Sequence, residues 1–407
     1  MRFLLACRSC GKQMPFAIKA GSCKCGGTLL VAYDLERIRR TLTKEKLKNL
    51  PATMWRYNEL LPIENEESII SLGEGWTPLV PLNMTKEILP GGKIWVKREE
   101  QNPTGSFKSR GFSAALSIAN EYGIRKVAVN SNGNAASALA AYAGYAGMEA
   151  YVFLPLDCPG LIVKECMDYG ARTFLVDGLI HDAGRIVKEG EQEQGWYNVG
   201  TLKEPGRVEG KKTMGLEIAE QLQWKLPDVI IYPTGGGSGI IGMWNAFLQL
   251  KELGFVEGDL PRMVSVQEQG CQPLVDAVRN NAQFKPQCHH VYSSPTGMRV
   301  PDPPDGQLVV SVLLESGGTA VSVTGTEIQQ AQKILGKQGI SSSPEGAAAL
   351  AGLFRLIERN FIRSTDEVVL FNTSHSLKYL PWDCIGLPIV KTYRHWVSVS
   401  SPSELSV

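Results

Sequence analysis

A lysine between turn-forming residues and a helical run is the first candidate for chemistry in this chain of 407 residues. Residues 102–111 read Asn-Pro-Thr-Gly-Ser-Phe-Lys-Ser-Arg-Gly, with the lysine at position 108. The residues from Phe112 onward predict a helix, which places Lys108 on its first turn. The positive end of the helix dipole disfavours an ammonium ion there, so the pattern favours a neutral, nucleophilic amine. Such an amine suits Schiff-base chemistry; the alternative is an ordinary solvated lysine.

Four glycines within five residues are the second candidate. They follow apolar residues 227–232, which predict a strand, and precede an apolar run that predicts a helix from residue 240. Successive backbone N–H groups and a helix N-terminus would then face an anion, as in a phosphate cradle. The stretch matches neither the Walker pattern nor the dinucleotide-binding spacing. The predicted phosphate ligands are Gly235, Gly236, Gly237, Ser238 and Gly239.

Four cysteines near the N-terminus are spaced as metal ligands are. Cys7 and Cys10 are separated by two residues, and Cys23 and Cys25 by one, with two glycines behind them. Two such knuckles could hold one zinc ion on four thiolates. The one-residue gap is shorter than the usual two, so a small cysteine-containing lobe without metal is the alternative. Any zinc there would be structural, because four thiolates leave no open position.

The elements that must position these residues alternate between strand and helix. Strands are predicted at residues 93–97, 126–130, 150–155, 171–176, 227–232, 262–266 and 366–371, and residues 309–315 are expected to be extended. Helices are predicted within residues 35–50, 112–122, 135–143, 164–169, 182–194, 207–223, 240–248 and 326–336, and another begins near residue 345. Residues 284–306 are expected to form a long functional loop. This alternation predicts open parallel sheets flanked by helices.

Composition narrows the classes of protein that the chain can belong to. Lysine plus arginine number 42 and aspartate plus glutamate 41, so the net charge of +1 gives no case for binding nucleic acid or an anionic membrane. No apolar run is long enough to span a bilayer, and the first residues do not resemble a signal peptide. Nine scattered cysteines argue against a disulfide framework. We therefore expect a cytoplasmic protein with reduced thiols and two domains.

Together, the lysine, the glycine-rich stretch and two polar turns at strand ends indicate pyridoxal phosphate. A protein must hold that cofactor's phosphate, aldehyde, phenolic oxygen and ring nitrogen. The glycine-rich stretch suits the phosphate, Lys108 the aldehyde and Asn134 the phenolic oxygen. Thr373 or Ser374, which follow the last predicted strand, suit the ring nitrogen. All lie at or beyond strand carboxyl ends, where open α/β sheets place their ligands.

Several motifs make the chain similar to the pyridoxal-phosphate enzymes of the tryptophan-synthase-β type and, among them, to the threonine synthases. The resemblance covers residues 1 to about 385, including the cysteine-rich start. The motifs are Trp55-Arg-Tyr, Gly73-Glu-Gly-Trp-Thr-Pro, Asn102-Pro-Thr-Gly-Ser-Phe-Lys108, Gly133-Asn134-Ala-Ala, Arg207-Val-Glu-Gly-Lys-Lys-Thr, Pro233-Thr-Gly-Gly-Gly, Pro344-Glu-Gly-Ala-Ala, and Asn372-Thr373 with Leu377-Lys378.

The resemblance implies an enzyme, a lyase of threonine biosynthesis. Threonine synthases convert O-phosphohomoserine and water to threonine and phosphate by γ-elimination and β-addition. In this chain Lys108 would carry the cofactor and, once freed, take the Cα proton. Asn134 would contact the phenolic oxygen. Thr373 would face the ring nitrogen as a neutral partner, which favours elimination over transamination.

Two anionic groups of such a substrate need separate sites. The turn at Ser131 and Asn132, at a predicted helix start, would hold the carboxylate. Arg207 is the first candidate for the leaving phosphate, because its planar fork matches phosphate geometry. Lys211 and Ser131 are the next candidates. The expected partner is therefore a small amino-acid phosphoester, and a homodimer is left open.

Three departures from the family pattern concern the substrate. Ser109 stands where an aspartate is common, Asn132 where a serine is common, and residues 373–376 read Thr-Ser-His-Ser rather than a glycine-containing motif. They leave open a β-replacement or dehydratase enzyme acting on O-phosphoserine, serine or threonine, for example one like cysteate synthase. A zinc-ribbon binding protein with an inactive enzyme body is the third alternative, which the intact lysine and glycine-rich stretch disfavour.

The resemblance also implies the architecture known as fold type II. Two open twisted sheets flanked by helices would hold the cofactor between two domains, with a cysteine-rich ribbon-like lobe in front. The expected boundaries are 1–34 for the lobe, 35–122 with 201–389 for the large cofactor-binding domain, 123–200 for the smaller α/β domain, and 390–407 for a polar tail.

Overall fold

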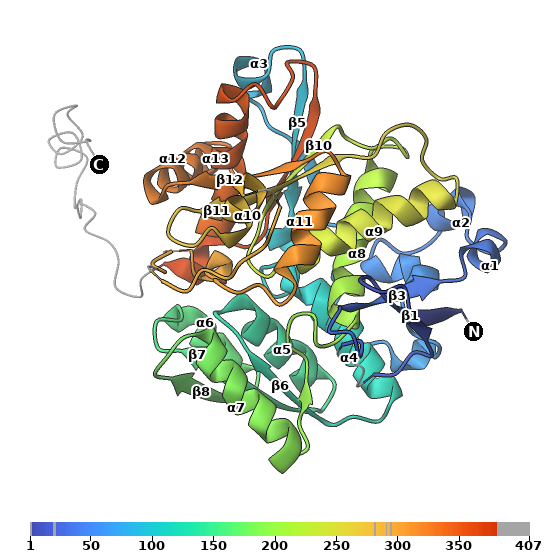
Figure 1. The fold of residues 1–407 in the computed structure, drawn as a ribbon. Coiled ribbons are helices and arrows are strands. Elements are labelled where there is room, and N and C mark those ends of the chain that lie inside the picture. The colour runs from blue at the N-terminus through green and yellow to red at the C-terminus, as the bar shows by residue number, and fades with distance from the viewer. Residues whose placement is uncertain (1, 19–21, 281, 290, 294, 381–407) are drawn as a thin grey trace, which may run out of the picture.

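Three sheets organise the structure, a computed structural model that describes residues 2–18, 22–280, 282–289, 291–293 and 295–380 (Figure 1). The first is a small antiparallel sheet of order β2-β1-β3 at the N-terminus. Its strands are β1 (Phe3–Cys7), β2 (Gln13–Met14) and β3 (Leu29–Tyr33). The end of β1 carries Cys7, and the connecting segments carry Cys10, Cys23 and Cys25, so this sheet is the predicted cysteine-rich lobe.

The largest sheet has six strands in the order β12-β11-β10-β13-β5-β4. All neighbours are parallel except β4, which runs antiparallel to β5 at one edge. The strands are β4 (Leu79–Pro81), β5 (Lys93–Arg98), β10 (Val229–Pro233), β11 (Arg262–Glu268), β12 (Thr319–Val323) and β13 (Glu367–Asn372). The chain enters this sheet before residue 100 and returns to it after residue 228, so residues far apart in sequence share its carboxyl edge.

The second parallel sheet has four strands in the order β8-β7-β6-β9. Its strands are β6 (Lys126–Asn130), β7 (Glu149–Pro155), β8 (Arg172–Val176) and β9 (Tyr197–Asn198). Figure 1 shows this sheet and its helices as a separate layer beneath the six-stranded sheet. The predicted domain boundaries stay a prediction, and the predicted polar tail lies outside the described residues.

Helices cover both faces of both parallel sheets. The α-helices are α1 (Leu35–Arg39), α2 (Lys44–Lys48), α3 (Thr85–Ile88), α4 (Lys108–Glu121), α5 (Asn134–Tyr145), α6 (Gly160–Asp168), α7 (Ile180–Glu193), α8 (Gly206–Gln221), α9 (Ser238–Glu252), α10 (Pro273–Arg279), α11 (Gly306–Glu315), α12 (Gly325–Lys337) and α13 (Pro344–Glu358). Short 3-10 turns are η1 (Met54–Leu60), η2 (Glu66–Ser68), η3 (Glu99–Gln101), η4 (Thr296–Met298) and η5 (Ser376–Tyr379). No described helix has the length and apolarity to span a membrane.

Alternation along the strands explains why helices lie on both faces. In β10, Val229 and Ile231 pack in a core with α12 and α13, whereas Ile230 and Tyr232 pack in a second core with α8, α9 and α11. Successive strand side chains point to opposite faces, so a strand that is apolar throughout needs a cover on each side. The run of apolar residues in β10 is thus the sequence signature of a central parallel strand.

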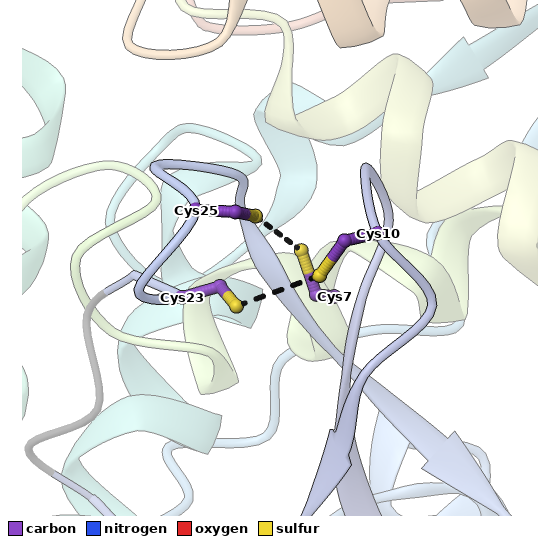
Figure 2. Close-up of side chains that lie close together, drawn as sticks. All are labelled: Cys7, Cys10, Cys23 and Cys25. Carbon is purple, nitrogen blue, oxygen red and sulfur yellow. Dashed lines mark hydrogen bonds between the residues drawn. The ribbon is translucent and has the colours of Figure 1, made fainter.

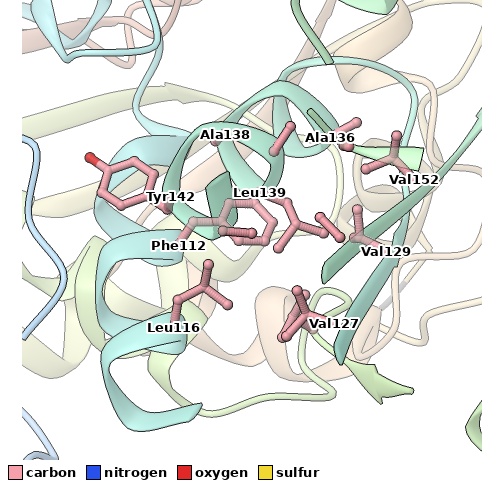
Figure 3. Close-up of a cluster of buried hydrophobic side chains, with 14 of the residues drawn as sticks. Phe112, Leu116, Val127, Val129, Ala136, Ala138, Leu139, Tyr142 and Val152 are labelled. Carbon is pink, nitrogen blue, oxygen red and sulfur yellow. The ribbon is translucent and has the colours of Figure 1, made fainter. Parts of the chain in front are cut away.

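The smaller sheet follows the same rule. Val127 and Val129 of β6 pack against Leu139 of α5 and Phe112 of α4, as Figure 3 shows. Ala128, between them, lies in a separate cluster with side chains of α7. Because Phe112 comes from α4, the helix that begins at Lys108 bridges the core of the smaller sheet to the larger one. The position of Lys108 is therefore fixed from both sides.

One predicted element was wrong. Residues 309–315 were expected to be extended, but they form most of α11. The apolar run Leu308–Leu314 satisfies either period, and a short apolar run does not distinguish strand from helix. The helix is set by its start, where the Asp305 side chain accepts a hydrogen bond from the Leu308 backbone N–H (2.9 Å). Helix α10 and strand β12 were not predicted.

Candidate active site

A cavity of about 420 Å³ lies between the two parallel sheets. Three strand ends supply its walls: the turn after β6, the glycine-rich loop after β10 and the residues after β13. The predicted functional loop contributes Gly297, Met298, Val300, Asp302 and Pro304 to the lining. Carboxyl ends of parallel strands leave room for a ligand because the connections to the following helices diverge there. The sequence candidates that line this cavity are Lys108, Ser131, Asn132, Asn134, Gly235, Gly236, Gly237, Ser238, Gly239, Thr373 and Ser374.

Lys108 is the first residue of α4, as the sequence pattern predicted. The pKa of its side chain is lowered from 10.5 to about 7, chiefly because the surrounding protein desolvates the ammonium, and then because of the charge of Arg207. The carboxylate of Glu345 acts in the opposite direction. The helix dipole was the expected cause, but burial is the larger one in the structure. Lys108 therefore has a large neutral fraction near pH 7, as a nucleophilic amine requires.

The glycine-rich loop turns directly into α9, which begins at Ser238. Gly237 has a φ of 77°, and a Cβ placed on it would lie 2.1 Å from the side chain of Val309. A Cβ on Gly239 would lie 2.4 Å from the hydroxyl of Tyr232. Glycine is required at both positions, by backbone conformation in the first and by close packing in both. The loop is consequently held in one conformation with a helix N-terminus at its end, which suits a phosphate group.

A buried lysine reinforces this loop. Lys211, from α8, donates a hydrogen bond from Nζ to the Ser238 hydroxyl over 2.8 Å. Burial lowers the pKa of Lys211 well below its usual value, and the charges of Arg207 and Lys108 lower it further. The protonated forms of Lys211, Lys108 and Arg207 repel one another, which lowers the pKa values of the two lysines further, and a phosphate dianion is the group that would offset that repulsion. Lys211 thus belongs with the loop of Ser238 and does not itself line the cavity.

Asn134, the first residue of α5, lies across the cavity from the loop after β13. Its Nδ2 donates to the hydroxyl of Tyr379 over 2.7 Å, and its Oδ1 is buried without a hydrogen-bond partner. Rotating the amide about χ2 would let Tyr379 donate to Oδ1 and would free the NH2 group for an acceptor in the cavity. A phenolic oxygen is such an acceptor, so Asn134 fits the contact expected of it.

Thr373 and Ser374 follow β13, and both are buried in the cavity wall. The backbone carbonyl of Thr373 accepts a hydrogen bond from the Phe107 N–H (3.0 Å). This bond joins the end of β13 to the residue before Lys108. The neutral hydroxyls are thereby placed on the same cavity as the amine. Amine, glycine-rich loop, amide and hydroxyl together match the groups that pyridoxal phosphate requires.

Glu345 and Tyr379 line the cavity as well, although they were not among the predicted site residues. Glu345 Oε1 accepts from the Gly297 backbone N–H (2.9 Å), while its Oε2 is buried with no partner. Tyr379 contacts Asn134, and burial raises the pKa of its phenol well above the usual value. The signals were present, since Glu345 belongs to the Pro344-Glu-Gly motif and Tyr379 directly follows Leu377-Lys378. Neither motif said which side chain points inward.

The predicted carboxylate site is the turn between β6 and α5. Ser131 Oγ accepts from the backbone N–H groups of Gly133 (3.0 Å) and Ala136 (3.3 Å). Asn132 Nδ2 donates to the carbonyls of Thr296 (3.1 Å) and Arg299 (3.0 Å), and so ties the turn to the long loop. Both side chains line the cavity. Their role toward a substrate stays a prediction.

Arg207 is placed differently from the other substrate candidates. Its side chain is only 1% exposed, its guanidinium lies 3.9 Å from the ring centroid of Phe112, and it donates to the carbonyl of Val199. It is not among the cavity-lining residues. Burial lowers the pKa of Arg207 to about 10, and its charge lowers the pKa of Lys108. A direct contact with a substrate phosphate would require the guanidinium to leave this position.

Ser109, one of the departures from the family pattern, points away from the cavity. Its hydroxyl lies 2.8 Å from the Thr104 hydroxyl and accepts from the Thr104 backbone N–H (3.3 Å). It therefore closes the turn before Lys108 and is fully buried. Asn132 and Thr373–Ser374 do line the cavity. Of the three departures, those two stretches are the ones able to act on substrate choice directly.

The four N-terminal cysteines form a second cluster, away from the cavity. Their Sγ atoms all lie within 4.8 Å of one another, and Figure 2 shows the two knuckles facing each other. Cys7 Sγ is 3.4 Å from Cys25 Sγ, and Cys10 Sγ is 3.7 Å from Cys23 Sγ. Four sulfur atoms at this spacing match the donor set of a tetrahedral structural zinc site. The shorter gap between Cys23 and Cys25 does not prevent convergence.

Comparison with known proteins gives concordant findings. A family model described as pyridoxal-phosphate dependent enzyme matches residues 70–374. The threonine synthase of Methanocaldococcus jannaschii is 36% identical over 377 residues, which are 92% of this chain and 93% of that protein. The threonine synthase of Methanosarcina acetivorans is 36% identical over 377 residues, which are 92% of each chain.

Solved structures agree at the level of the fold. Maize serine racemase superposes with a TM-score of 0.63 at 21% identity, covering 79% of this chain and 91% of that one. A pyridoxal 5'-phosphate-dependent aspartate racemase gives 0.65 at 18% identity, covering 75% and 93%. At such low identity these likenesses concern the fold alone. They confirm the predicted α/β class with two helix-flanked sheets.

Proposed function

Because the chain belongs to the family of pyridoxal-phosphate dependent enzymes, we propose that it acts as a threonine synthase, converting O-phosphohomoserine and water to threonine and phosphate. The observation that carries the proposal is the convergence of Lys108, Asn134 and the glycine-rich loop on one cavity, in a chain related to threonine synthases over most of its length. When bound, pyridoxal phosphate supplies an electron-withdrawing ring that stabilises negative charge at the carbon next to the amino group.

The protein's own side chains have distinct roles in this proposal. The amine of Lys108 takes the proton from the substrate's Cα, which its lowered pKa of about 7 supports. Gly235–Gly239 hold the cofactor's phosphate together with Lys211. Asn134 orients the ring through its phenolic oxygen. Thr373 presents a neutral hydroxyl to the ring nitrogen, which leaves that nitrogen without a proton and suits elimination chemistry.

The carboxylate of the substrate binds at the start of α5 in this proposal. The turn of Ser131 and Asn132 lines the cavity there, and the dipole of α5 favours an anion at the start of that helix. Ser131 Oγ accepts from the Gly133 N–H (3.0 Å) and donates to the Gly133 carbonyl (3.3 Å), so its bonds lie within the turn and its role is to shape it. We propose that Arg207 acts at a distance, as a buried positive charge behind the wall that favours anionic groups in the cavity.

A substrate panel tests the proposed activity. The purified protein with pyridoxal phosphate is offered O-phosphohomoserine, O-phosphoserine, serine and threonine, and released phosphate, amino acid and keto acid are measured. We expect phosphate and threonine in equal amounts from O-phosphohomoserine. Phosphate from O-phosphoserine alone would instead identify a β-replacement enzyme, and keto acid from threonine or serine a dehydratase. No phosphate from O-phosphohomoserine would contradict the proposal.

We also propose that Cys7, Cys10, Cys23 and Cys25 hold one structural zinc ion. We expect about one zinc per chain by mass spectrometry of protein purified under reducing conditions. Cys10→Ser should lose the metal while the visible band of the bound cofactor persists, because the cluster does not line the cavity. Cys288→Ser is the matched control, since that thiol is also exposed but lies outside the cluster. Metal-free protein of unchanged thermal stability would refute the zinc site.

A further inference from the structure

The cysteine-rich lobe contacts a helix that supports the glycine-rich loop, and the proposed function does not use this connection. Arg8 lies between Cys7 and Cys10 in the first knuckle, and Thr28 follows Cys25 of the second knuckle by three residues. The Arg8 N–H donates to the Thr28 carbonyl (3.2 Å), which holds the two residues side by side. Their side chains contact opposite ends of α11. The two knuckles of the cysteine cluster are therefore joined to one helix of the larger domain.

Thr28 makes the contact at the start of α11. Its side chain is 8% exposed, and its Oγ1 donates to Asp305 Oδ2 over 2.5 Å. Asp305 is the N-cap of α11, because its Oδ1 accepts from the Leu308 N–H (2.9 Å). One carboxylate thus joins the lobe to the first turn of the helix. Hydrogen bonds to a charged acceptor are stronger than those between neutral groups, so this contact is a firm one.

The contact at the end of α11 is weaker. Arg8 pairs with Glu315, the last residue of the helix, over 2.9 Å, but the two side chains are 39% and 45% exposed. Solvent-exposed ion pairs contribute little. Leu30 of β3 is buried in the same apolar core as Val309 of α11 and adds to the attachment. Thr28 is the residue of the lobe whose specific bond to α11 can be removed without opening a cavity.

Helix α11 in turn packs on the glycine-rich loop. Val309, one turn after Asp305, lies so close to Gly237 that a Cβ on that glycine would be 2.1 Å from its side chain. Pro304, directly before Asp305, lines the cavity, and a Cβ on Gly236 would lie 3.8 Å from its ring. Asp305 therefore has a residue that lies against the loop on each side of it. Close-packed interiors transmit a shift of one element to the next.

We infer that Thr28 is a positioning residue for the cofactor's phosphate: through Asp305 it fixes the start of α11, and α11 fixes the glycine-rich loop. This inference rests on the proposed role of that loop in holding the phosphate. It also gives the cysteine cluster a role beyond the stability of the lobe. A metal ion that draws the two knuckles together holds Thr28 against Asp305, so metal occupancy and cofactor affinity are coupled.

Three variants and two ligands test the inference. Thr28→Val keeps the shape of the side chain and removes its hydroxyl, whereas Thr28→Ser keeps the hydroxyl. Ser9→Ala is the control, because Ser9 is an exposed residue of the first knuckle without a hydrogen bond to the described residues of α11. Cofactor-free protein is titrated with pyridoxal phosphate and with pyridoxal, which lacks the phosphate, and the visible band is recorded.

Thr28→Val should bind pyridoxal phosphate about fivefold more weakly than the original protein does. Its affinity for pyridoxal should be unchanged, because Lys108 keeps its place on α4 and only the loop for the phosphate has lost support. Thr28→Ser and Ser9→Ala should keep the original affinity for both ligands. A general loss of folded structure would weaken both ligands together, so the ratio of the two dissociation constants isolates the loop.

The coupling to the metal has its own test. Cys10→Ser should weaken the binding of pyridoxal phosphate about fivefold, although the visible band still forms with excess cofactor. In the Thr28→Val background the same substitution should have no further effect, because both changes act through one contact. Additive effects of the two substitutions would refute the coupling between the cysteine cluster and the loop.

Unchanged affinity for pyridoxal phosphate in Thr28→Val would overturn the inference. Equal losses for pyridoxal phosphate and pyridoxal, or an equal effect of Ser9→Ala, would overturn it as well. The proposed function fails on a different result. If the original protein forms the visible band but releases no phosphate from O-phosphohomoserine, the threonine synthase activity is refuted, while the cofactor titrations still decide the role of Thr28.

Discussion

At the scale of single residues, the proposed chemistry depends on the pKa of one amine, that of Lys108. Lys108 is surrounded by protein and lies near a second cation, Arg207, and both lower its pKa. The carboxylate of Glu345 opposes them. A lysine at an exposed helix start would keep a pKa near its usual value. The tertiary environment, more than the helix dipole, therefore prepares this side chain to react.

The first prediction concerns the pH dependence of cofactor capture. Because the neutral amine reacts and its pKa is about 7, the rate at which cofactor-free protein takes up pyridoxal phosphate should rise as pH increases to about 7 and then level off. Stopped-flow recording of the visible band from pH 5.5 to 9 measures this. Lys108→Ala should give no band at any pH. A rate that climbs steadily to pH 9 would indicate an ordinary lysine.

Glu345 and Tyr379 also belong to the residue scale. The Tyr379 hydroxyl accepts from Asn134 Nδ2, and Glu345 Oε2 is buried with no hydrogen-bond partner among the described residues. Buried polar atoms are nearly always satisfied, so an unpaired carboxylate oxygen beside a ligand cavity indicates a contact that the ligand completes. Both residues lie in or beside motifs that are visible in the sequence, but the motifs do not indicate which side chains point into the cavity.

At the scale of elements, the β10–loop–α9 unit forms the site that we propose for the cofactor's phosphate. The unit works because its glycines allow Val309 of α11 and Tyr232 of β10 to approach the loop. Helix α11 packs on this loop and so supports the site, although its residues 309–315 were predicted to be extended. An extended segment there would not fill the space behind Gly237.

Gly237→Ala tests this support. The new Cβ would meet Val309 at 2.1 Å while the backbone keeps a φ of 77°, so both packing and conformation oppose it. We expect a loss of about 1–3 kcal/mol in stability and a fall in cofactor affinity. Gly336→Ala is the matched control, because that helical glycine has open space around its Cβ position. The control should be stabilised by about 0.5–1 kcal/mol. Equal changes in the free energy of unfolding and in cofactor affinity for Gly237→Ala and Gly336→Ala would show that the packing of Val309 on the loop does not support the site.

At the scale of the whole molecule, a buried ion network joins the elements that carry the site. Glu217 of α8 accepts from Arg110 of α4 (2.6 and 2.7 Å) and from Lys97 of β5 (2.8 Å), and all three side chains are fully buried. Arg110 also pairs with Glu99 (2.7 Å). Because Arg110 lies two residues after Lys108, this network fixes the first turn of α4 against the six-stranded sheet.

Removing one partner of such a network should be costly. Glu217→Gln leaves Lys97 and Arg110 with a single carboxylate between them, and we expect a loss of about 3–5 kcal/mol in the free energy of unfolding. Glu358→Gln is the control, since that exposed partner of Arg355 should contribute less than about 1 kcal/mol. Denaturation by urea compares the two variants, and equal losses would rule out a dominant role of the buried network.

The same network sets how the protein responds to acid. Burial alone would raise the pKa of Glu217, but the charges of Arg110 and Lys97 hold it at about 2, below its usual 4.5. A carboxyl whose pKa is lower in the folded state stabilises the fold above its unfolded pKa. That contribution should decline as pH falls from about 4.5 towards 2, and it should be absent in Glu217→Gln.

Much of this molecule is determined by local patterns in the sequence. The strand-to-helix alternation, the glycine-rich stretch after β10 and the lysine at the start of α4 depend on neighbouring residues, so they were predicted correctly. Their common placement followed from one rule, that parallel strands put their carboxyl ends on the same edge. The cysteine spacing likewise predicted a cluster that the structure brings together.

Tertiary structure decided what no local pattern contains. Residues 309–315 form a helix because Asp305 caps its first turn and because its apolar side chains pack on the six-stranded sheet. Arg207 does not line the cavity because its guanidinium packs against the Phe112 ring. Ser109 does not line it because its hydroxyl bonds that of Thr104. Side-chain direction and the pKa of Lys108 depend on contacts between distant residues, and these form only in the folded chain.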